Sequence, residues 1–152
     1  MRYRVVAVGA MKRGPLAEAA QRYAKLLSGP ASVELVEVKD RTASGVDAAR
    51  AAHDEQALRH AEGHLLLVDE TGDQLTTAEL AERVDAWERG GASRITLFVG
   101  GPDGHGRALR EAVDGSLALS RLTLPHDLAR VVLLEQLYRV EALRAGHPYH
   151  RS

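Results

Sequence analysis

Residues 95–126, ITLFVGGPDGHGRALREAVDGSLALSRLTLPH, decide how this chain is interpreted. The segment opens with the apolar run ITLFV (95–99), which stops at Gly100-Gly101, and it closes with LTLPH (122–126). Glycine and proline permit or impose backbone conformations that end a strand. We therefore interpret the two apolar pieces as strand-like segments that form two walls of one ligand-binding crevice.

On both sides of this segment, strand-like and helix-like patterns alternate. Apolar runs that end in glycine or polar residues predict strands, and apolar residues at helical spacing predict helices. Thr76 or Thr77, with Glu79 or Glu82 after it, predicts a helix start, and DETG (69–72) predicts a turn. The alternation predicts one α/β domain over residues 1–152, with a largely parallel sheet. The predicted strands cover 3–8, 33–38, 65–68, 95–99 and 116–119, and the predicted helices cover 16–27, 46–61, 77–89, 107–113 and 127–145.

The composition excludes several classes of protein. The 152 residues include no cysteine, which excludes disulfides, thiolate metal sites and cysteine nucleophiles. No apolar run is long enough for a signal peptide or a membrane span, so we expect a soluble, cytoplasmic protein. The net charge of −1 is unevenly spread: residues 1–41 carry an excess of four positive charges, 42–93 of seven negative and 94–152 of two positive. A polyanion partner and a solvated acidic helix pair explain this pattern equally well.

The helix predicted at 127–145 is apolar around most of its circumference. A helix of this kind is normally buried on all sides. Either a second copy of the chain covers it or it lies centrally within the monomer. We expect the first arrangement, a homodimer whose interface includes this helix.

Familiar catalytic motifs are absent or weak. The loop GGPDGHG (100–106) lacks the order of a dinucleotide fingerprint, so a tight structural turn explains it as well as a ligand loop does. No G-x-S-x-G elbow is present, and His60 and His64 lack metal-ligand spacing. His53 and His60 fit a solvated helix face. His126 stands at a strand end before a helix, where catalytic groups are often presented, although a structural role fits equally.

The last residues combine aromatic and cationic groups. The tail HPYHR (147–151) places two imidazoles, a phenol and a guanidinium within five residues. Terminal residues are often frayed. The same groups side by side also suit base stacking and phosphate contacts with RNA.

Together these residues resemble the ribosomal RNA large-subunit methyltransferase H family, which is part of the SPOUT class of methyltransferases. The resemblance covers essentially the whole chain, although residues 39–63 match only in general character. The pairing of LTLPH with the terminal PYH is its most specific part. The matching segments are VAVG (6–9), VGGPDG (99–104), LSRLTLPH (119–126), Arg130, EQLYR (135–139) and HPYHR (147–151).

The resemblance implies an α/β fold with a C-terminal trefoil knot, an obligate homodimer, and S-adenosylmethionine bound in the knot. It also implies transfer of a methyl group to N3 of a pseudouridine in helix 69 of 23S rRNA, on the assembled ribosome. Methyl transfer from a sulfonium depends mainly on alignment of the nucleophile, so no metal is expected. The lack of a long apolar run gives no reason to expect a membrane partner.

The resemblance also assigns roles to residues. His126 or Tyr149 would assist removal of the N3 proton. Arg130, His150 and Arg151 would contact RNA, from the other subunit if the site is shared, and Lys12 and Arg13 would extend that surface. The donor pocket would comprise Val68, Asp69, Gly100, Gly101, Ser120, Arg121, Leu122, Thr123, Leu124 and Pro125, with the role of the Arg121 side chain open.

Two other functions remain compatible with the sequence. One is a non-catalytic ribosome- or RNA-binding module of the same fold, and the other is a nucleotide-binding regulatory domain of ordinary doubly wound topology. The intact glycine loop, LTLPH and tail favour the methyltransferase, because a pure binding module would have no need of a donor pocket.

Overall fold

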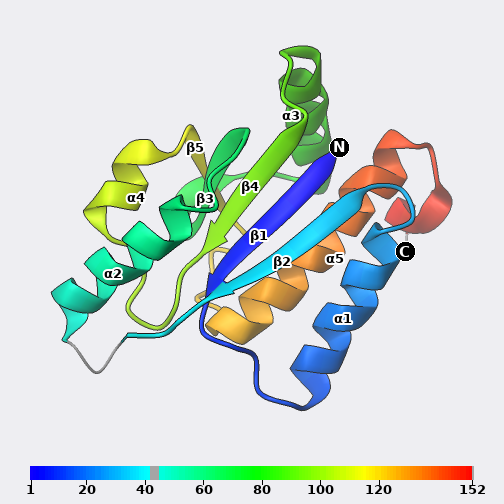
Figure 1. The fold of residues 1–152 in the computed structure, drawn as a ribbon. Helices are drawn as coiled ribbons and strands as arrows, with labels where there is room; N and C mark the ends of the chain where they lie inside the picture. The colour runs from blue at the N-terminus through cyan, green and yellow to red at the C-terminus, as the bar shows by residue number, and fades with distance from the viewer. Residues whose placement is uncertain (42–44, 152) are drawn as a thin grey trace.

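A five-stranded parallel sheet lies between two layers of helices in the computed structural model (Figure 1). The structure describes residues 1–41 and 45–151, with the backbone alone for His150 and Arg151. The elements are β1 (Arg2–Val8), α1 (Pro15–Leu27), β2 (Ser32–Val38), α2 (Val46–Leu58), β3 (His64–Gln74), α3 (Thr77–Arg89), β4 (Arg94–Val99), α4 (Arg107–Ala112), β5 (Gly115–Ala118), α5 (His126–Arg144) and the short 3-10 helix η2 (Pro148–Arg151).

The strands follow the order β2-β1-β4-β3-β5, and every pairing is parallel, which confirms the predicted sheet. The central strand is β4, which pairs with β1 on one side, where Tyr3 lies opposite Ile95, and with β3 on the other. This order differs from the usual doubly wound orders, 3-2-1-4-5-6 and 2-1-3-4-5. A regulatory domain of ordinary doubly wound topology is therefore not what the chain forms.

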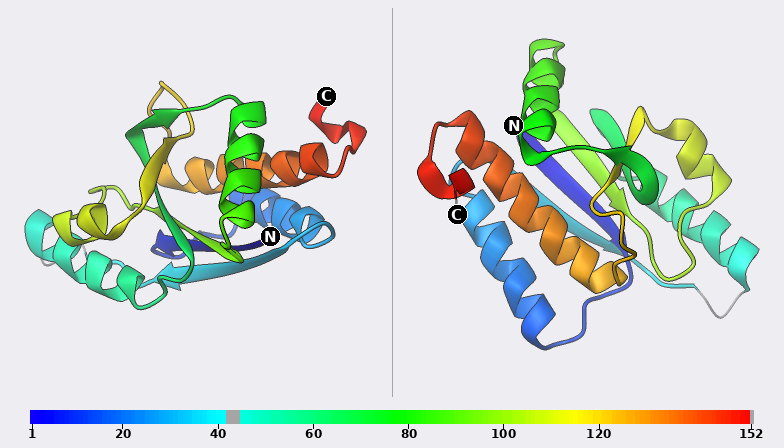
Figure 2. Two further views of the ribbon diagram at one scale, coloured as in Figure 1. Left: turned by 90° about the horizontal axis from the view of Figure 1, so that it is seen from above. Right: turned by 180° about the vertical axis from the view of Figure 1, so that it is seen from behind.

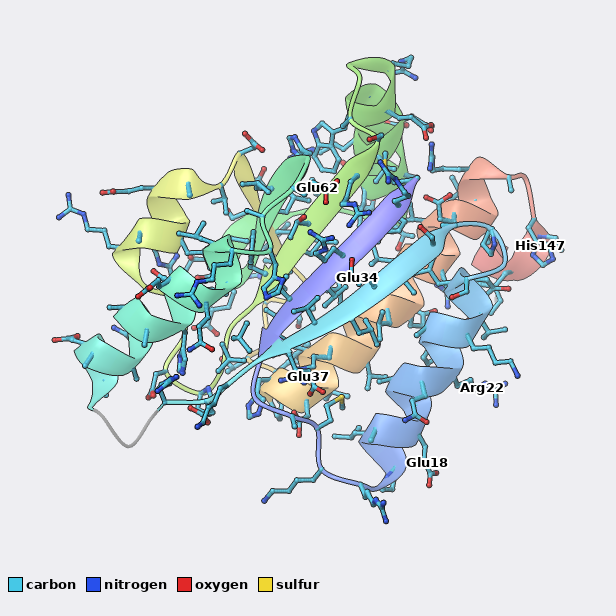
Figure 3. The ribbon with its side chains drawn as sticks, in the orientation of Figure 1. Glu18, Arg22, Glu34, Glu37, Glu62 and His147 are labelled. Carbon is cyan, nitrogen blue, oxygen red and sulfur yellow. The ribbon has the colours of Figure 1, made fainter. Side chains whose placement is uncertain are left out.

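Alternate residues of each strand enter two separate cores, as the period of two requires. On one side of the sheet α1, α3 and α5 cover Tyr3, Val5 and Ala7, and on the other α2 and α4 cover Val6 and Val8. Figure 2 shows the two helix layers from above and from behind. A further restraint joins the strands at their amino ends, where Arg4 and Arg94 each pair with Glu34 and Glu62. Figure 3 labels the two glutamates.

The turn predicted at 69–72 was wrong, because β3 continues to Gln74. Its pairing with β5 shifts register between Val68 and Asp73, both of which lie opposite Leu117. The four intervening residues therefore bulge out of the ladder, and the strand resumes beyond them. A Cβ on Gly72 would lie 2.7 Å from the backbone nitrogen of Leu117, so glycine is needed for this close approach.

Helix α2 ends at Leu58, three residues before the predicted end at 61. The amides of His60 and Ala61 bond to Ala57 and Leu58, three residues back, so the last turn tightens out of the α-helix. Gly63, with φ of 76°, then turns the chain into β3. The polar link predicted before α2, residues 39–45, includes 42–44, which lie outside the described residues.

Helix α5 packs between α1 and α3 within the single chain (Figure 2). Leu133, Leu134, Leu137 and Val140 are each at most 1% exposed there. The apolar circumference that suggested a dimer is thus largely buried in the monomer. Among the residues that the structure describes, no helix is both long and apolar enough to cross a membrane.

Candidate active site

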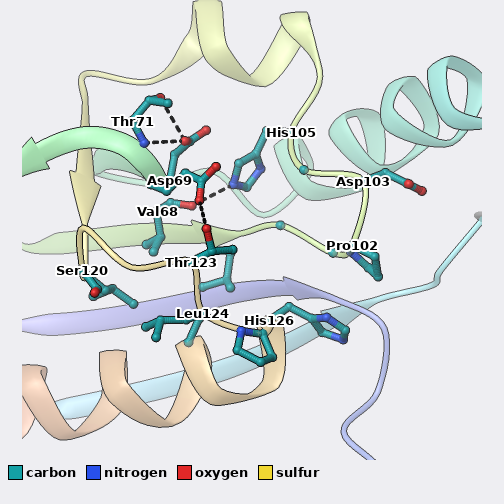
Figure 4. Close-up of a pocket in the computed structure, with 18 of the residues that line it drawn as sticks. Val68, Asp69, Thr71, Pro102, Asp103, His105, Ser120, Thr123, Leu124 and His126 are labelled. Carbon is teal, nitrogen blue, oxygen red and sulfur yellow. Dashed lines mark hydrogen bonds between the residues drawn. The ribbon is translucent and has the colours of Figure 1, made fainter.

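A cavity of about 770 Å³ opens at the carboxyl end of β4, beside the bulge of β3 and against the segment after β5 (Figure 4). Ligands of open α/β sheets bind at this edge. The cavity brings together nine of the ten predicted donor-pocket residues, and His126 joins them. Its lining comprises Arg50, Val68, Asp69, Glu70, Thr71, Val99, Gly100, Gly101, Pro102, Asp103, Gly104, His105, Arg110, Leu119, Ser120, Leu122, Thr123, Leu124, Pro125, His126 and Ala129.

The first wall is the bulged part of β3. The Asp69 carboxylate accepts hydrogen bonds from the backbone amide and hydroxyl of Thr71, both at 2.9 Å, and from Arg110 at 2.5 Å. Burial raises the pKa of Asp69, but the hydrogen bonds from Thr71 and Arg110 outweigh it and lower that pKa overall. Asp69 therefore stays ionised at neutral pH and forms a fixed part of the wall.

The second wall is the loop after β4, which turns tightly where the amide of Gly104 donates to the carbonyl of Gly101. Gly104 has φ of 75°, a conformation that favours glycine. A Cβ on Gly101 would lie 3.0 Å from the Val8 side chain, so glycine lets the loop pack against the end of β1. The loop thus brings its backbone to the cavity in one defined shape.

Residues 119–126, which connect β5 to α5, form the third wall, and we call this segment the strap. The Ser120 hydroxyl accepts from the amide of Leu122 at 2.9 Å, and Thr123 donates to Glu70 of β3 at 2.9 Å. The Leu122 side chain is 76% exposed, which leaves an apolar group at the cavity mouth. Arg121 was predicted to line the pocket, but its exposed side chain does not, since the neighbours on both sides do so instead.

The two candidate proton acceptors lie apart along α5, His126 at its start and Tyr149 against its middle. His126, the first residue of α5, lines the cavity, with its Nε2 3.3 Å from an Asp127 carboxylate oxygen. Tyr149 follows α5 and packs on Tyr138, with ring centroids 4.6 Å apart. The Tyr149 hydroxyl lies against Glu135, nine residues after His126, and nine helical residues rise by about 14 Å. One chain therefore does not bring His126 and Tyr149 together.

Tyr149 is held where the tail folds back on α5. Its hydroxyl donates to Glu135 at 3.4 Å, and the Arg139 guanidinium lies 5.0 Å from the ring centroid. Burial, together with the charge of Glu135, raises the pKa of Tyr149. The phenol is therefore protonated at neutral pH.

Arg130 was predicted to contact RNA, but its side chain is buried and joins α5 to the end of β1 and to β2. Its guanidinium donates to the carbonyls of Val8 and Gly9 at 2.5 and 2.7 Å and to Glu37 at 3.0 Å. Only 6% of the side chain is exposed, because α5 presses this part of its first turns against the end of β1. The side chains of His150 and Arg151 lie outside the described residues.

The sequence interpretation missed six polar residues of the cavity: Arg50, Glu70, Thr71, Asp103, His105 and Arg110. Nε2 of His105 lies 3.1 Å from the carbonyl of Val68. Burial, the largest influence, lowers the pKa of His105, so its imidazole is neutral at physiological pH. His105 could have been suspected from its place in the glycine loop, but Arg50 lies on a helix remote in sequence.

Comparison of the sequence with known proteins identifies the family. Residues 1–150 match the family model described as "Predicted SPOUT methyltransferase". Curated proteins named ribosomal RNA large subunit methyltransferase H are similar over nearly full length. One from Thermus thermophilus is 45% identical, with 99% of each chain covered, and that of Nitrosospira multiformis is 44% identical, with 100% of each covered. The protein of Synechococcus sp. strain RCC307 is 43% identical, covering 99% of this chain and 95% of the relative.

The chain belongs to the ribosomal RNA large subunit methyltransferase H family. As a member of this SPOUT family it is an rRNA methyltransferase, which confirms the resemblance drawn from LTLPH and PYH. Within the described residues, no group of three or more His, Cys, Asp or Glu side chains could hold a metal ion.

Proposed function

We propose that this methyltransferase transfers the methyl group of S-adenosylmethionine to N3 of a pseudouridine in helix 69 of 23S rRNA on the ribosome. The observation that carries the proposal is the cavity of about 770 Å³, which gathers the glycine loop, the bulge of β3 and the strap at 119–126 in a family of rRNA methyltransferases. The nucleoside and the donor come from the family resemblance.

The chemistry of the cavity fits the proposed donor. Val68, Val99, Leu119 and Leu124 provide apolar surface for the faces of an adenine, while the loop and strap provide backbone groups for its edge. Asp69 is paired with Arg110, so Glu70, which accepts a hydrogen bond from the Thr123 hydroxyl, is the carboxylate that would favour a cationic ligand such as a sulfonium or ammonium. Bound there, S-adenosylmethionine would supply an electrophilic methyl group.

The chain's own chemical task is to handle the proton that leaves N3 of the acceptor. His126 is our candidate for the proton acceptor, since it lines the cavity and is half-exposed. The alternative, Tyr149, is protonated at neutral pH and is bonded to Glu135. Tyr149 would more readily act as a hydrogen-bond donor to the nucleoside.

We further propose a homodimer in which the tail of one subunit reaches the cavity of the other, and a chain threaded into a trefoil knot around the strap. The separation of His126 from Tyr149 along α5 supports a shared site, because a second copy could place them together. RNA would approach over Lys12 and Arg13, both exposed after the carboxyl end of β1. Within that arrangement His150 and Arg151 remain candidates for RNA contacts and the protein would act in the cytoplasm.

Two measurements test the proposal. Calorimetry should detect S-adenosylmethionine binding to the folded protein, and mass spectrometry of rRNA nucleosides should detect one methylated pseudouridine after incubation of unmethylated ribosomes with protein and labelled donor. Methylation of a different nucleoside would overturn the proposed target. Failure of the folded protein to bind the donor would instead favour the non-catalytic RNA-binding module.

A further inference from the structure

One face of α2 carries three inward-pointing polar residues: Arg50, His53 and Asp54. Their spacing of three and four places them on the same side of the helix. His53, expected on a solvated face, is only 4% exposed, and its Nε2 accepts the backbone amide of Arg41 at 2.8 Å. This face of α2 is therefore committed to contacts within the protein.

Asp54 supplies the N-terminal cap of a different helix. Its carboxylate is 2% exposed and accepts the amides of Gly106 and Leu109, each at 3.0 Å. These amides belong to the first turn of α4, which has no helical partners for them. Gly106, the residue at the cap position, has no side chain to do this. Helix α2 thus supplies the N-terminal cap that the sequence of α4 lacks.

The fit between Asp54 and Gly106 is close. A Cβ on Gly106 would lie 2.4 Å from a carboxylate oxygen of Asp54, a separation that no real side chain tolerates. The absence of a side chain at Gly106 therefore allows the Asp54 carboxylate to approach the backbone. The contact fixes the end of the loop 100–106.

Arg50 fixes the middle of the same loop, where its Nε donates to the carbonyl of Asp103 at 2.6 Å. Four of the seven residues in GGPDGHG are glycine, which loses more conformational freedom on ordering than any other residue. External contacts are what give such a loop a single shape. Arg50 and Asp54, four residues apart on one rigid helix, supply two of them.

We propose that α2 positions the donor loop, and that Asp54 and Arg50 are positioning residues for methyl-donor binding. The inference rests on the proposed function, since the loop 100–106 lines the proposed donor cavity. Asp54 acts through the backbone of Gly106 and Leu109, and Arg50 through that of Asp103. Donor affinity then depends on α2, a helix that lies outside the sequence motifs of the donor pocket.

The test measures S-adenosylmethionine binding by calorimetry in Asp54→Asn and Arg50→Met, with the melting temperature of each. An asparagine offers one acceptor oxygen where the two amides need two, so one amide loses its partner. We expect Kd for the donor to rise about tenfold in each variant. In the double variant Kd should rise by less than the product of the two single increases, because both residues act on one loop.

Asp47→Asn is the matched control, since Asp47 is exposed on the same helix, and it should bind the donor like the unaltered protein. The KM for ribosomes should stay unchanged in all variants. Folded Arg50→Met and Asp54→Asn proteins with unaltered Kd would overturn the inference, even if their melting temperatures fall. If Asp54→Asn does not fold, Arg50→Met decides alone. Failure of the unaltered protein to bind the donor would overturn the proposed function itself, and is thus distinguishable.

Discussion

His126 is the residue on which the proposed chemistry depends most. We predict that His126→Asn lowers the rate of methyl transfer by about a hundredfold or more, the usual contribution of a general base, and leaves donor affinity within about twofold. Tyr149→Phe should have a smaller effect on rate, because its phenol is protonated at neutral pH. Single-turnover kinetics on ribosomes measures both.

The control for His126 is His60→Asn, remote from the cavity, which should transfer at the normal rate. Transfer at an unaltered rate by a folded His126→Asn protein would remove His126 from the proposed role.

His105 should make stability depend on pH. Burial lowers its folded-state pKa, whereas in the unfolded chain the group titrates near pH ~6.5. The unfolded chain therefore binds the proton more readily, and stability is lost as the pH falls from about 6.5 through the folded pKa. We predict that the urea concentration at the unfolding midpoint falls less between pH 7.5 and 5.5 in His105→Gln than in the unaltered protein.

His64 provides an independent comparison, since burial also lowers its pKa. His64→Gln should remove a separate part of the same pH dependence. An equal fall of the urea midpoint in His105→Gln and in the unaltered protein would show that His105 is not a source of the pH dependence.

At the scale of elements, α3 shows how far local sequence rules reach. Thr76 accepts the amide of Glu79 at 3.1 Å, and Glu79 accepts the amide of Thr76 at 2.7 Å, the reciprocal cap that the sequence predicts. Thr76→Ala should lower the free energy of unfolding by about 1 kcal/mol, measured by urea denaturation. Glu82→Gln, an exposed change in the same helix, should be nearly neutral, and an equal loss in both would refute the cap.

Elements defined by local signals were predictable, and those defined by distant partners were not. The cap of α3 and the apolar runs of β1 and β4 are written in consecutive residues. The continuation of β3 depends instead on how Gly72 meets Leu117, forty-five residues later. The same reason explains the site: the donor-pocket residues come from recognisable segments, whereas Arg50 enters the cavity only through tertiary packing.

At the scale of the whole molecule, the proposed dimer makes a sharp prediction. Leu137 is 1% exposed within one chain, whereas Val132 on α5 is only partly buried. Val132→Glu should therefore yield a folded monomer that binds the donor but no longer methylates ribosomes, because cavity and tail would lie on different copies. Analytical ultracentrifugation measures the subunit number.

Leu137→Ala is the comparison. It should cost about 2–5 kcal/mol of stability through the cavity that it leaves, without changing the subunit number. A folded dimer in Val132→Glu would show that this part of α5 lies outside the interface.

The strand order has a consequence for how the protein is made. The central neighbours β1 and β4 are separated by more than eighty residues, and α5, which covers β1 and α1, comes last. A growing chain can pair β1 with β2 early, but the apolar face of α1 has no α5 to pack on until synthesis is nearly complete. Contacts of such long sequence separation slow folding and prolong exposure of apolar surface. A nascent chain of this enzyme would therefore depend on protection from aggregation until its last helix arrives.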